Sequence, residues 1–147
     1  RGGGSGKAPA ADLDTLPIGQ AEILRQGRSI ALLAFGSMLT PALAAAEELD
    51  ATVANMRFVK PIDRELIIEL AREHSLLLSI EENTVIGGAG AEVARVLDEL
   101  THSVRFVRMG LPDRFIGHGD QTRLLAEVDL DKDGIIRTVR AQQNAAE

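Results

Sequence analysis

Short apolar runs alternate along this chain with apolar stripes of helical spacing. The clearest example begins with residues 76–80 (LLLSI), followed by the acidic pair at 81–82 and the glycine cluster at 87–90. An apolar run of this length, bounded by turn signals, is typical of a buried strand. The apolar positions that follow are Val93, Val96, Leu97 and Leu100. Their i, i+3, i+4, i+7 spacing predicts an amphipathic helix, so this segment is interpreted as strand, polar loop, glycine turn and helix.

Two further apolar runs precede this segment. Residues 19–26 and 29–35 flank Gly27, and the second run, SIALLAF, is almost wholly apolar. A tight turn between two strands favours a hairpin, which predicts one antiparallel strand at the edge of the sheet.

Helix start signals follow the strands. Thr40 is predicted to cap a helix with Pro41 at its first position, because proline lacks an N–H that would be unpaired there anyway. This Ala-rich helix is expected to end near Leu49. A strand over residues 53–59 comes next, and Asp63 is predicted to cap the following helix. The apolar side of that helix is formed by Leu66, Ile67, Leu70 and Ala71.

The last third of the chain predicts one more strand and two more helices. Residues 104–109 alternate in part and indicate a strand near a sheet edge, ended by the residues after Gly110. A helix is expected from about Asp120 and a last helix after Gly134. Strands alternating with helices predict an α/β fold with a mainly parallel sheet and right-handed crossovers. Residues 1–15, rich in Gly, Ala and Asp, are interpreted as a linker before a single domain at 16–147.

Composition and charge exclude several classes of function. The 147 residues carry a net charge of −6 and contain no Trp, Tyr or Cys. An acidic chain without stacking aromatics is a poor nucleic-acid partner. The lack of cysteine fits a reducing cytoplasm, and neither a membrane span nor a signal peptide is expected from the pattern. Because the sequence starts at Arg1, we expect it to be a piece of a longer polypeptide.

Metal and hydrolase motifs receive little support. Asp129, Asp131 and Asp133 match the first half of a calcium-binding EF-hand loop, but the twelfth position, which needs a bidentate Glu, is Arg140. We therefore expect no tight calcium binding, and the dipole of a helix start alone favours such acids. The histidines, His74, His102 and His118, are scattered without a zinc-binding pattern, and no serine has a nucleophile-elbow context.

The glycine cluster and its acidic neighbours are the remaining candidates. The cluster at 87–90 matches neither phosphate-binding fingerprint, so tight backbone packing is its expected role, with anion binding as the alternative. Glu81 and Glu82 are neighbours on an extended segment and point to opposite faces, so they do not form a converging acid–base pair. A polar contact to another domain is the expected use of these glutamates. Local physics thus predicts an α/β domain without catalytic, cofactor or metal residues of its own.

Several motifs in order resemble one enzyme family. They are NMRFVKPID at 55–63, EEN at 81–83, GGAG at 87–90 and GLPDRFI at 110–116. Together they resemble the C-terminal domain of the 1-deoxy-D-xylulose 5-phosphate synthases, in the transketolase superfamily, over residues 16–141. The resemblance implies a three-layer α/β/α domain with a five-stranded mixed sheet, mainly parallel with one antiparallel strand.

The same resemblance implies the chemistry. Enzymes of this family condense pyruvate with glyceraldehyde 3-phosphate, with loss of carbon dioxide, in isoprenoid and thiamine precursor synthesis. They use thiamine diphosphate and Mg²⁺, bound by residues of the N-terminal and middle domains, which are outside this chain. A homodimer is also implied, with this domain contributing to the contact.

One substrate contact is implied at the start of the chain. The family carries a Tyr-Pro-Arg-Gly turn whose arginine holds the substrate phosphate, and Arg1-Gly2 matches its last two residues. The alternative is that Arg1 is a linker arginine in solvent. Arg57 is interpreted as structural, because related arginines recur in superfamily members with unphosphorylated substrates.

Two other functions stay open. One is the non-catalytic C-terminal domain of another thiamine-dependent enzyme, such as a 2-oxoacid dehydrogenase β subunit, although the run at 56–61 (MRFVKP) differs there. The other is a free-standing nucleotide-binding α/β protein, against which the missing phosphate fingerprint counts.

Overall fold

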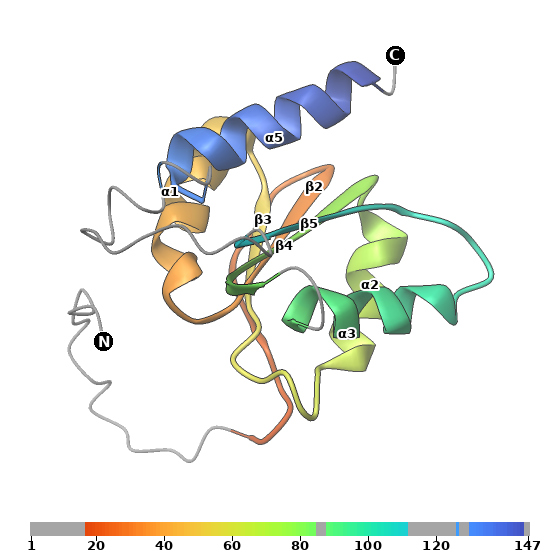
Figure 1. Cartoon of the computed structure of the whole chain (residues 1–147). Helices are drawn as coiled ribbons and strands as arrows, with labels where there is room; N and C mark the ends of the chain where they lie inside the picture. The colour runs from red at the N-terminus through yellow and green to blue at the C-terminus, as the bar shows by residue number, and fades with distance from the viewer. Residues whose placement is uncertain (1–16, 85–87, 112–125, 127–129, 146–147) are drawn as a thin grey trace.

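A computed structural model describes residues 17–84, 88–111, 126 and 130–145 of the chain, and Figure 1 shows its course. The strands are β1 (Glu22–Arg25), β2 (Ile30–Ala34), β3 (Thr52–Asn55), β4 (Leu76–Thr84) and β5 (Arg105–Leu111). The helices are the 3₁₀ turn η1 (Gly36–Met38), α1 (Leu39–Leu49), α2 (Arg64–Glu73), α3 (Ala89–Asp98) and α5 (Lys132–Ala145). The predicted linker at 1–15 and the helix expected from Asp120 lie outside the described residues.

The five strands form one mixed sheet in the order β1-β3-β2-β4-β5. β2, β3, β4 and β5 are parallel to their neighbours, whereas β1 pairs antiparallel with β3. The predicted five-stranded, mainly parallel sheet and its antiparallel edge strand are therefore confirmed. The predicted hairpin is wrong, because β3 lies between β1 and β2. The predicted position of residues 104–109 near a sheet edge is confirmed, since β5 is the other edge strand.

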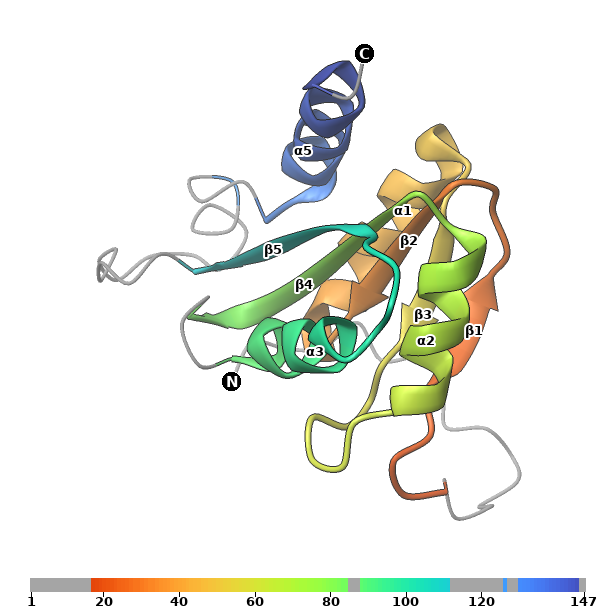
Figure 2. The same ribbon diagram turned by 90° about the vertical axis from the view of Figure 1, so that its right-hand side faces the viewer.

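Helices cover both faces of the sheet, so the domain has three layers (Figures 1 and 2). α1 and α5 pack on one face over a core that includes Leu32, Leu78 and Ile135. α2 and α3 pack on the other face, over Leu33 and Leu77 among others. β2 is buried along its whole length because it contributes to both cores. This explains why residues 30–34 are a continuous apolar run rather than an alternating one.

The helix starts differ in part from those predicted. Asp63 caps α2 as predicted, its Oδ1 accepting from the Leu66 N–H at 3.1 Å. Thr40 does not cap α1, since the helix begins at Leu39, with Met38 at the N-cap position and no side-chain cap bond. The 3₁₀ turn accounts for this difference: Gly36, with φ of 60°, turns the chain two residues after β2 ends.

Other strand and helix ends also differ from those predicted; β4 and β5, for example, run on to Thr84 and Leu111. The strand expected to reach Val59 stops at Asn55, and Arg57 turns the chain with a φ of 58°, an unusual value for a residue with a side chain. The last helix begins at Lys132 rather than after Gly134. Asp131 stabilises that start, because its Oδ1 accepts from the Gly134 N–H at 2.9 Å.

A polar chain at the amino end of the sheet fixes the turn between β1 and β2. The Gly27 N–H donates to Thr52 Oγ1 at 2.9 Å, and Thr52 Oγ1 lies 2.8 Å from His74 Nε2. His74 Nδ1 lies 2.9 Å from the Leu70 carbonyl oxygen, which can only accept, so Nδ1 carries the proton. The imidazole Nε2 then accepts the Thr52 hydroxyl proton. His74 is thus a satisfied core histidine.

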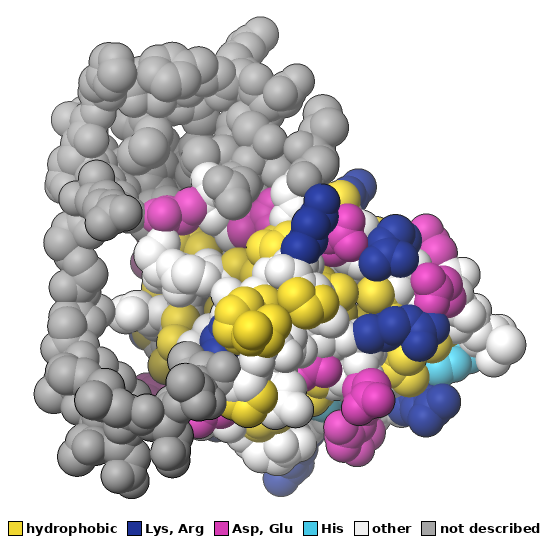
Figure 3. All heavy atoms as spheres, turned by 90° about the horizontal axis from the view of Figure 1, so that it is seen from below, with side chains coloured by type: hydrophobic (Ala, Val, Ile, Leu, Met, Phe, Trp, Pro, Cys, Tyr) yellow, Lys and Arg dark blue, Asp and Glu magenta, His cyan; other side chains and the backbone are white. Residues whose placement is uncertain are grey.

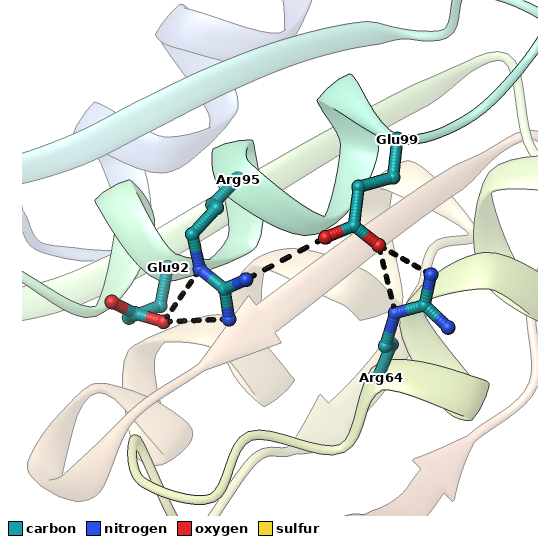
Figure 4. A network of polar contacts seen from close by, with 4 residues as sticks. All are labelled: Arg64, Glu92, Arg95 and Glu99. Carbon is teal, nitrogen blue, oxygen red and sulfur yellow. Dashed lines mark hydrogen bonds and ion pairs between the residues drawn. The ribbon is translucent and has the colours of Figure 1, made fainter.

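A charged network on the surface joins α2 to α3 (Figure 4). Glu99 accepts a hydrogen bond from Arg64 Nε at 3.0 Å and forms an ion pair with Arg95 Nη1 at 3.5 Å. Arg95 also pairs with Glu92 at 3.2 Å. Exposed pairs of this kind contribute little to stability one by one, so the network orients the two helices more than it stabilises them. Among the residues with a described position, no helix is long and apolar enough to span a membrane.

Candidate functional site at the carboxyl end of β4

Glu81 lies inside the domain rather than on a loop. β4 continues past the predicted apolar run to Thr84, so both glutamates belong to the strand. Glu81 is only 2% exposed, whereas Glu82 is half-buried. The expectation that Glu81 contacts another domain is therefore wrong, because its side chain is enclosed by this domain. The same expectation for Glu82 stays a prediction.

The carboxylate of Glu81 holds the start of α3. Its Oε2 accepts from the Gly90 N–H at 2.9 Å. The N-cap residue of α3 is Gly88, which has no side chain to cap the helix, so a glutamate from the neighbouring strand takes that role. The positive end of the helix dipole further favours a carboxylate at this point.

The second oxygen of this carboxylate has no hydrogen-bond partner among the described residues. Glu81 Oε1 and the hydroxyl oxygen of Ser79 are buried and, among the described residues, accept or donate no hydrogen bond. Burial raises the pKa of Glu81 above 4.5, while the backbone N–H groups of Gly90 and Ala89 and the charge of Arg108 act in the opposite direction. Desolvation is the largest of these effects.

Gly90 is required here by space. A Cβ atom at this position would lie 2.6 Å from Ser79 Oγ and 3.0 Å from the Cγ and Cδ atoms of Arg108. Ser79 and Arg108 are register partners on β4 and β5, so α3 approaches the sheet across this pair. The predicted role of the glycine cluster, tight backbone packing, is confirmed at Gly90.

The chemistry open to this arrangement is limited. One buried carboxylate accepts backbone N–H groups and lies beside a serine whose hydroxyl contacts no base. General acid–base catalysis needs a group within hydrogen-bond reach of a reacting proton, and Glu81 instead faces a helix start. The geometry is that of a clamp between β4 and α3.

Among the other residues considered from the sequence, those that the structure describes are not brought together into a site. Arg1, His118 and Asp129 lie outside the described residues. Asp131 caps α5 and Asp133 lies in its first turn, as the helix dipole favours. In the described part of the chain, no three His, Cys, Asp or Glu side chains form a group that could hold a metal ion. The described residues therefore offer no such group for Mg²⁺, and its binding by residues outside this chain stays a prediction.

Arg57 connects two segments that are distant in sequence. Its guanidinium forms an ion pair with Glu22 of β1, and its side chain is 19% exposed. The interpretation of Arg57 as structural agrees with this contact.

Sequence reasoning did not find the link of Glu81 to Gly90 or the contact of Thr52 with His74. Both join residues that are distant in the chain, by 9 and 22 positions. A polar residue continuing an apolar strand was the available signal at Glu81.

Comparisons with known proteins identify the family. Residues 19–135 match the family described as the transketolase C-terminal domain. The chain is 64% identical over 144 residues to a 1-deoxy-D-xylulose-5-phosphate synthase of Dechloromonas aromatica and 61% identical over 141 residues to that of an Azoarcus species. These alignments cover 98% and 96% of this chain but 23% of each relative. The chain thus spans about a quarter of the length of the curated relatives it matches.

Solved structures agree with the fold. A split-gene transketolase, described as an "inactive beta4 tetramer", matches with a TM-score of 0.78 and 35% identity. The match covers 84% of this chain and 42% of that one. A Pichia stipitis transketolase mutant matches with a TM-score of 0.58 and 18% identity, covering 86% of this chain and 18% of that one, and shows the fold alone. The three-layer architecture and the match over residues 19–135 agree, and the chain belongs to the transketolase C-terminal domain family.

Proposed function

We propose that this chain is the C-terminal domain of a 1-deoxy-D-xylulose 5-phosphate synthase, which condenses pyruvate with glyceraldehyde 3-phosphate with loss of carbon dioxide. The observation that carries the proposal is an identity of 64% that extends over 98% of the chain. Such an identity over the whole domain favours this enzyme over other thiamine-dependent families with the same fold.

The reacting groups belong to the rest of the enzyme. Thiamine diphosphate, held with Mg²⁺, supplies the electron sink for the decarboxylation when it is bound. We assign its binding to the preceding domains, because the described residues of this chain offer no metal-binding cluster. Glu81, the one buried carboxylate among the described residues, is occupied by the start of α3.

The role of this domain is structural and assembly-related. Its polar side chains with long-range contacts hold its own elements: Glu81 holds α3, and Arg57 holds β1. We propose that the domain supports a cytoplasmic homodimer of the full-length enzyme.

Turnover tests this assignment. The full-length polypeptide, with thiamine diphosphate and Mg²⁺, is expected to convert pyruvate and glyceraldehyde 3-phosphate, whereas the purified 147-residue chain is expected to form no product. Product from the 147-residue chain would show that it holds a complete site. No product from the intact, cofactor-loaded polypeptide would refute the assigned reaction.

Arg1 is the one proposed substrate contact. A guanidinium offers two parallel N–H donors to a phosphate and keeps its charge at working pH. Gly2 and Gly3 beside it would let the backbone approach the ligand without a side-chain clash. In the full-length enzyme, Arg1→Ala should cost about 2–4 kcal/mol of binding to glyceraldehyde 3-phosphate, the scale of a truncated charged contact.

Steady-state kinetics with each substrate varied in turn measure this effect. The specificity constant for glyceraldehyde 3-phosphate should fall, while the KM for pyruvate stays nearly unchanged. Lys7→Ala, which removes another positive charge from the predicted linker, is the matched control. An unchanged specificity constant in Arg1→Ala would leave Arg1 as a linker arginine in solvent.

A further inference from the structure

The exposed large apolar side chains of the described residues all lie in one short segment. They are Ile18, Ile23 and Leu24, which are 78%, 37% and 36% exposed. Single exposed apolar residues are ordinary, but their concentration within seven residues marks a contact surface. We call these three residues the β1 surface.

β1 is also an edge strand. It pairs with β3 on one side and, within the described residues, has no strand on the other. Edge strands in soluble proteins are usually protected by charge, proline or a covering element, because their free N–H and C=O groups attract other chains. The charged residues of β1 do not serve this purpose, since Glu22 pairs with Arg57 and Arg25 reaches Asp50 and the Ala51 carbonyl oxygen. The strand is instead only four residues long and irregular between Ile23 and Arg25, which limits strand addition, so the exposed apolar side chains, rather than a long backbone edge, carry the contact.

The segment that carries Ile18 is fixed to the domain. The Ala21 N–H donates to Asp63 Oδ2 at 2.8 Å. Gly19, with φ of 77°, lies so close to Pro61 that a Cβ atom there would be 2.9 Å from Pro61 Cγ. The start of β1 and the loop before α2 therefore lie together at the bottom of the molecule in Figure 1, and the view from below shows a band of apolar side chains across that face (Figure 3). Ile18 is thus presented from a fixed backbone.

The length of the relatives indicates what covers the β1 surface. This chain accounts for 23% of the matched synthases, and its family is a C-terminal domain, so the remaining length precedes it in the polypeptide. Resting on the proposed function, we propose that the β1 surface is where the preceding part of the same polypeptide docks on this domain. Ile18 is the central apolar contact, and the free edge of β1 offers backbone hydrogen bonds beside it.

The contacts of segment 19–22 would fix the orientation of the docked domain. Segment 19–22 connects the β1 surface to Asp63 at the start of α2 and to Arg57 after β3. A domain docked on Ile18 is thereby held in a fixed orientation relative to the carboxyl end of the sheet, rather than swinging on a linker.

Site-specific photocrosslinking in the full-length polypeptide tests the proposal. A benzoylphenylalanine replaces Ile18, and a matched variant carries it at Thr101, an exposed position after α3. Irradiation of the Ile18 variant should give a crosslinked product of single-chain mass, whose digest joins the residue-18 peptide to a peptide preceding this domain. Its yield should be several-fold above that of the Thr101 variant.

Two outcomes of the crosslinking overturn the proposal. Yields equal to those of the Thr101 variant would leave Ile18 in solvent, and a product of double-chain mass would assign the β1 surface to a second copy. A second variant, Ile18→Asp, should increase cleavage between the domains in limited proteolysis several-fold, and unchanged cleavage would contradict the docking. Turnover of the unsubstituted polypeptide is measured separately, so a failed crosslink in an active synthase refutes the docking surface alone.

Discussion

Substitution of Gly90 by alanine tests the packing of α3 on the sheet. The added Cβ would lie 2.6 Å from Ser79 Oγ, closer than van der Waals contact allows. Ser79 belongs to the buried strand β4 and is 0% exposed, so it cannot move aside. The carbons of Arg108, at 3.0 Å, belong to an exposed side chain that can shift at small cost. The clash with Ser79 therefore decides the outcome.

The expected magnitude follows from two opposing effects. Overpacking a well-packed core costs roughly 1–3 kcal/mol. Replacing glycine by alanine in a helix recovers at most about 1 kcal/mol. With full recovery the difference is about 0–2 kcal/mol. Because the 2.6 Å contact with Ser79 Oγ is well inside van der Waals contact, we expect Gly90→Ala to lower the free energy of unfolding by the upper half of that range, about 1–2 kcal/mol, and the Glu81 bond to the Gly90 N–H to lengthen as α3 moves outward.

A second substitution identifies the cause. Ser79→Ala removes the clashing oxygen and, because that hydroxyl has no hydrogen-bond partner in the described part of the chain, should by itself be nearly neutral or slightly stabilising. In the Ser79→Ala background, Gly90→Ala should cost no more than about 0.5 kcal/mol, a coupling of the size expected for residues in contact. Gly36→Ala is the control, because its cost arises from a φ of 60° with nothing within 4 Å of the new Cβ. That cost should be the same in both backgrounds.

Urea unfolding followed by far-ultraviolet circular dichroism measures these differences, since the chain has no Trp or Tyr for fluorescence. A Gly90→Ala protein as stable as its parent would refute the packing argument. An equal cost with and without the Ser79 hydroxyl would show that the strain lies elsewhere, in the helix start or against Arg108.

Two further predictions concern Glu81 and Gly27. Burial raises the folded-state pKa of Glu81 above 4.5, so the folded state binds this proton more tightly than the unfolded state does. The contribution of Glu81 to stability therefore declines as pH rises from about 4.5 through the raised pKa. Glu81→Gln does not titrate and should gain stability relative to the parent across that window; a pH-independent difference in urea midpoints would contradict this. Gly27→Ala would place a Cβ 2.3 Å from the backbone of residues 50 and 51, and backbone atoms cannot move aside as a side chain can. The urea midpoint of this variant should therefore fall further than that of Gly90→Ala. A smaller fall would contradict this.

The sequence pattern was sufficient for the elements and the fold class but not for the pairing of β1. Apolar runs on both sides of Gly27 satisfy a hairpin as well as they satisfy two strands separated by a third. The deciding contact is remote, since the backbone of β1 pairs with β3 about 30 residues later, with Glu22 opposite Asn55. A local pattern carries no information about such pairing.

The candidate site was missed for a related reason. Polar residues after an apolar strand usually mark its end, so Glu81 was expected at the carboxyl end of the strand, before a polar loop, and to contact another domain. Its partner is an N–H of α3, which every residue except proline possesses, and so no side-chain pattern reveals it. The glycine cluster was more informative, because a glycine has no Cβ and so by itself indicates that another segment can approach closely, as the sheet does at Gly90.

The use of polar groups at the carboxyl end of the sheet is the physical basis for assigning this domain a supporting role. In open α/β proteins this end is where ligands usually bind. Here the end of β4 carries Glu81, whose carboxylate holds α3, and the turn after β3 carries Arg57, whose guanidinium holds Glu22 of β1. Each group is committed to a contact within the domain, and releasing Glu81 to act on a ligand would leave the start of α3 without its acceptor. Both contacts support the proposal that the reacting groups of the full-length enzyme belong to residues that precede this domain.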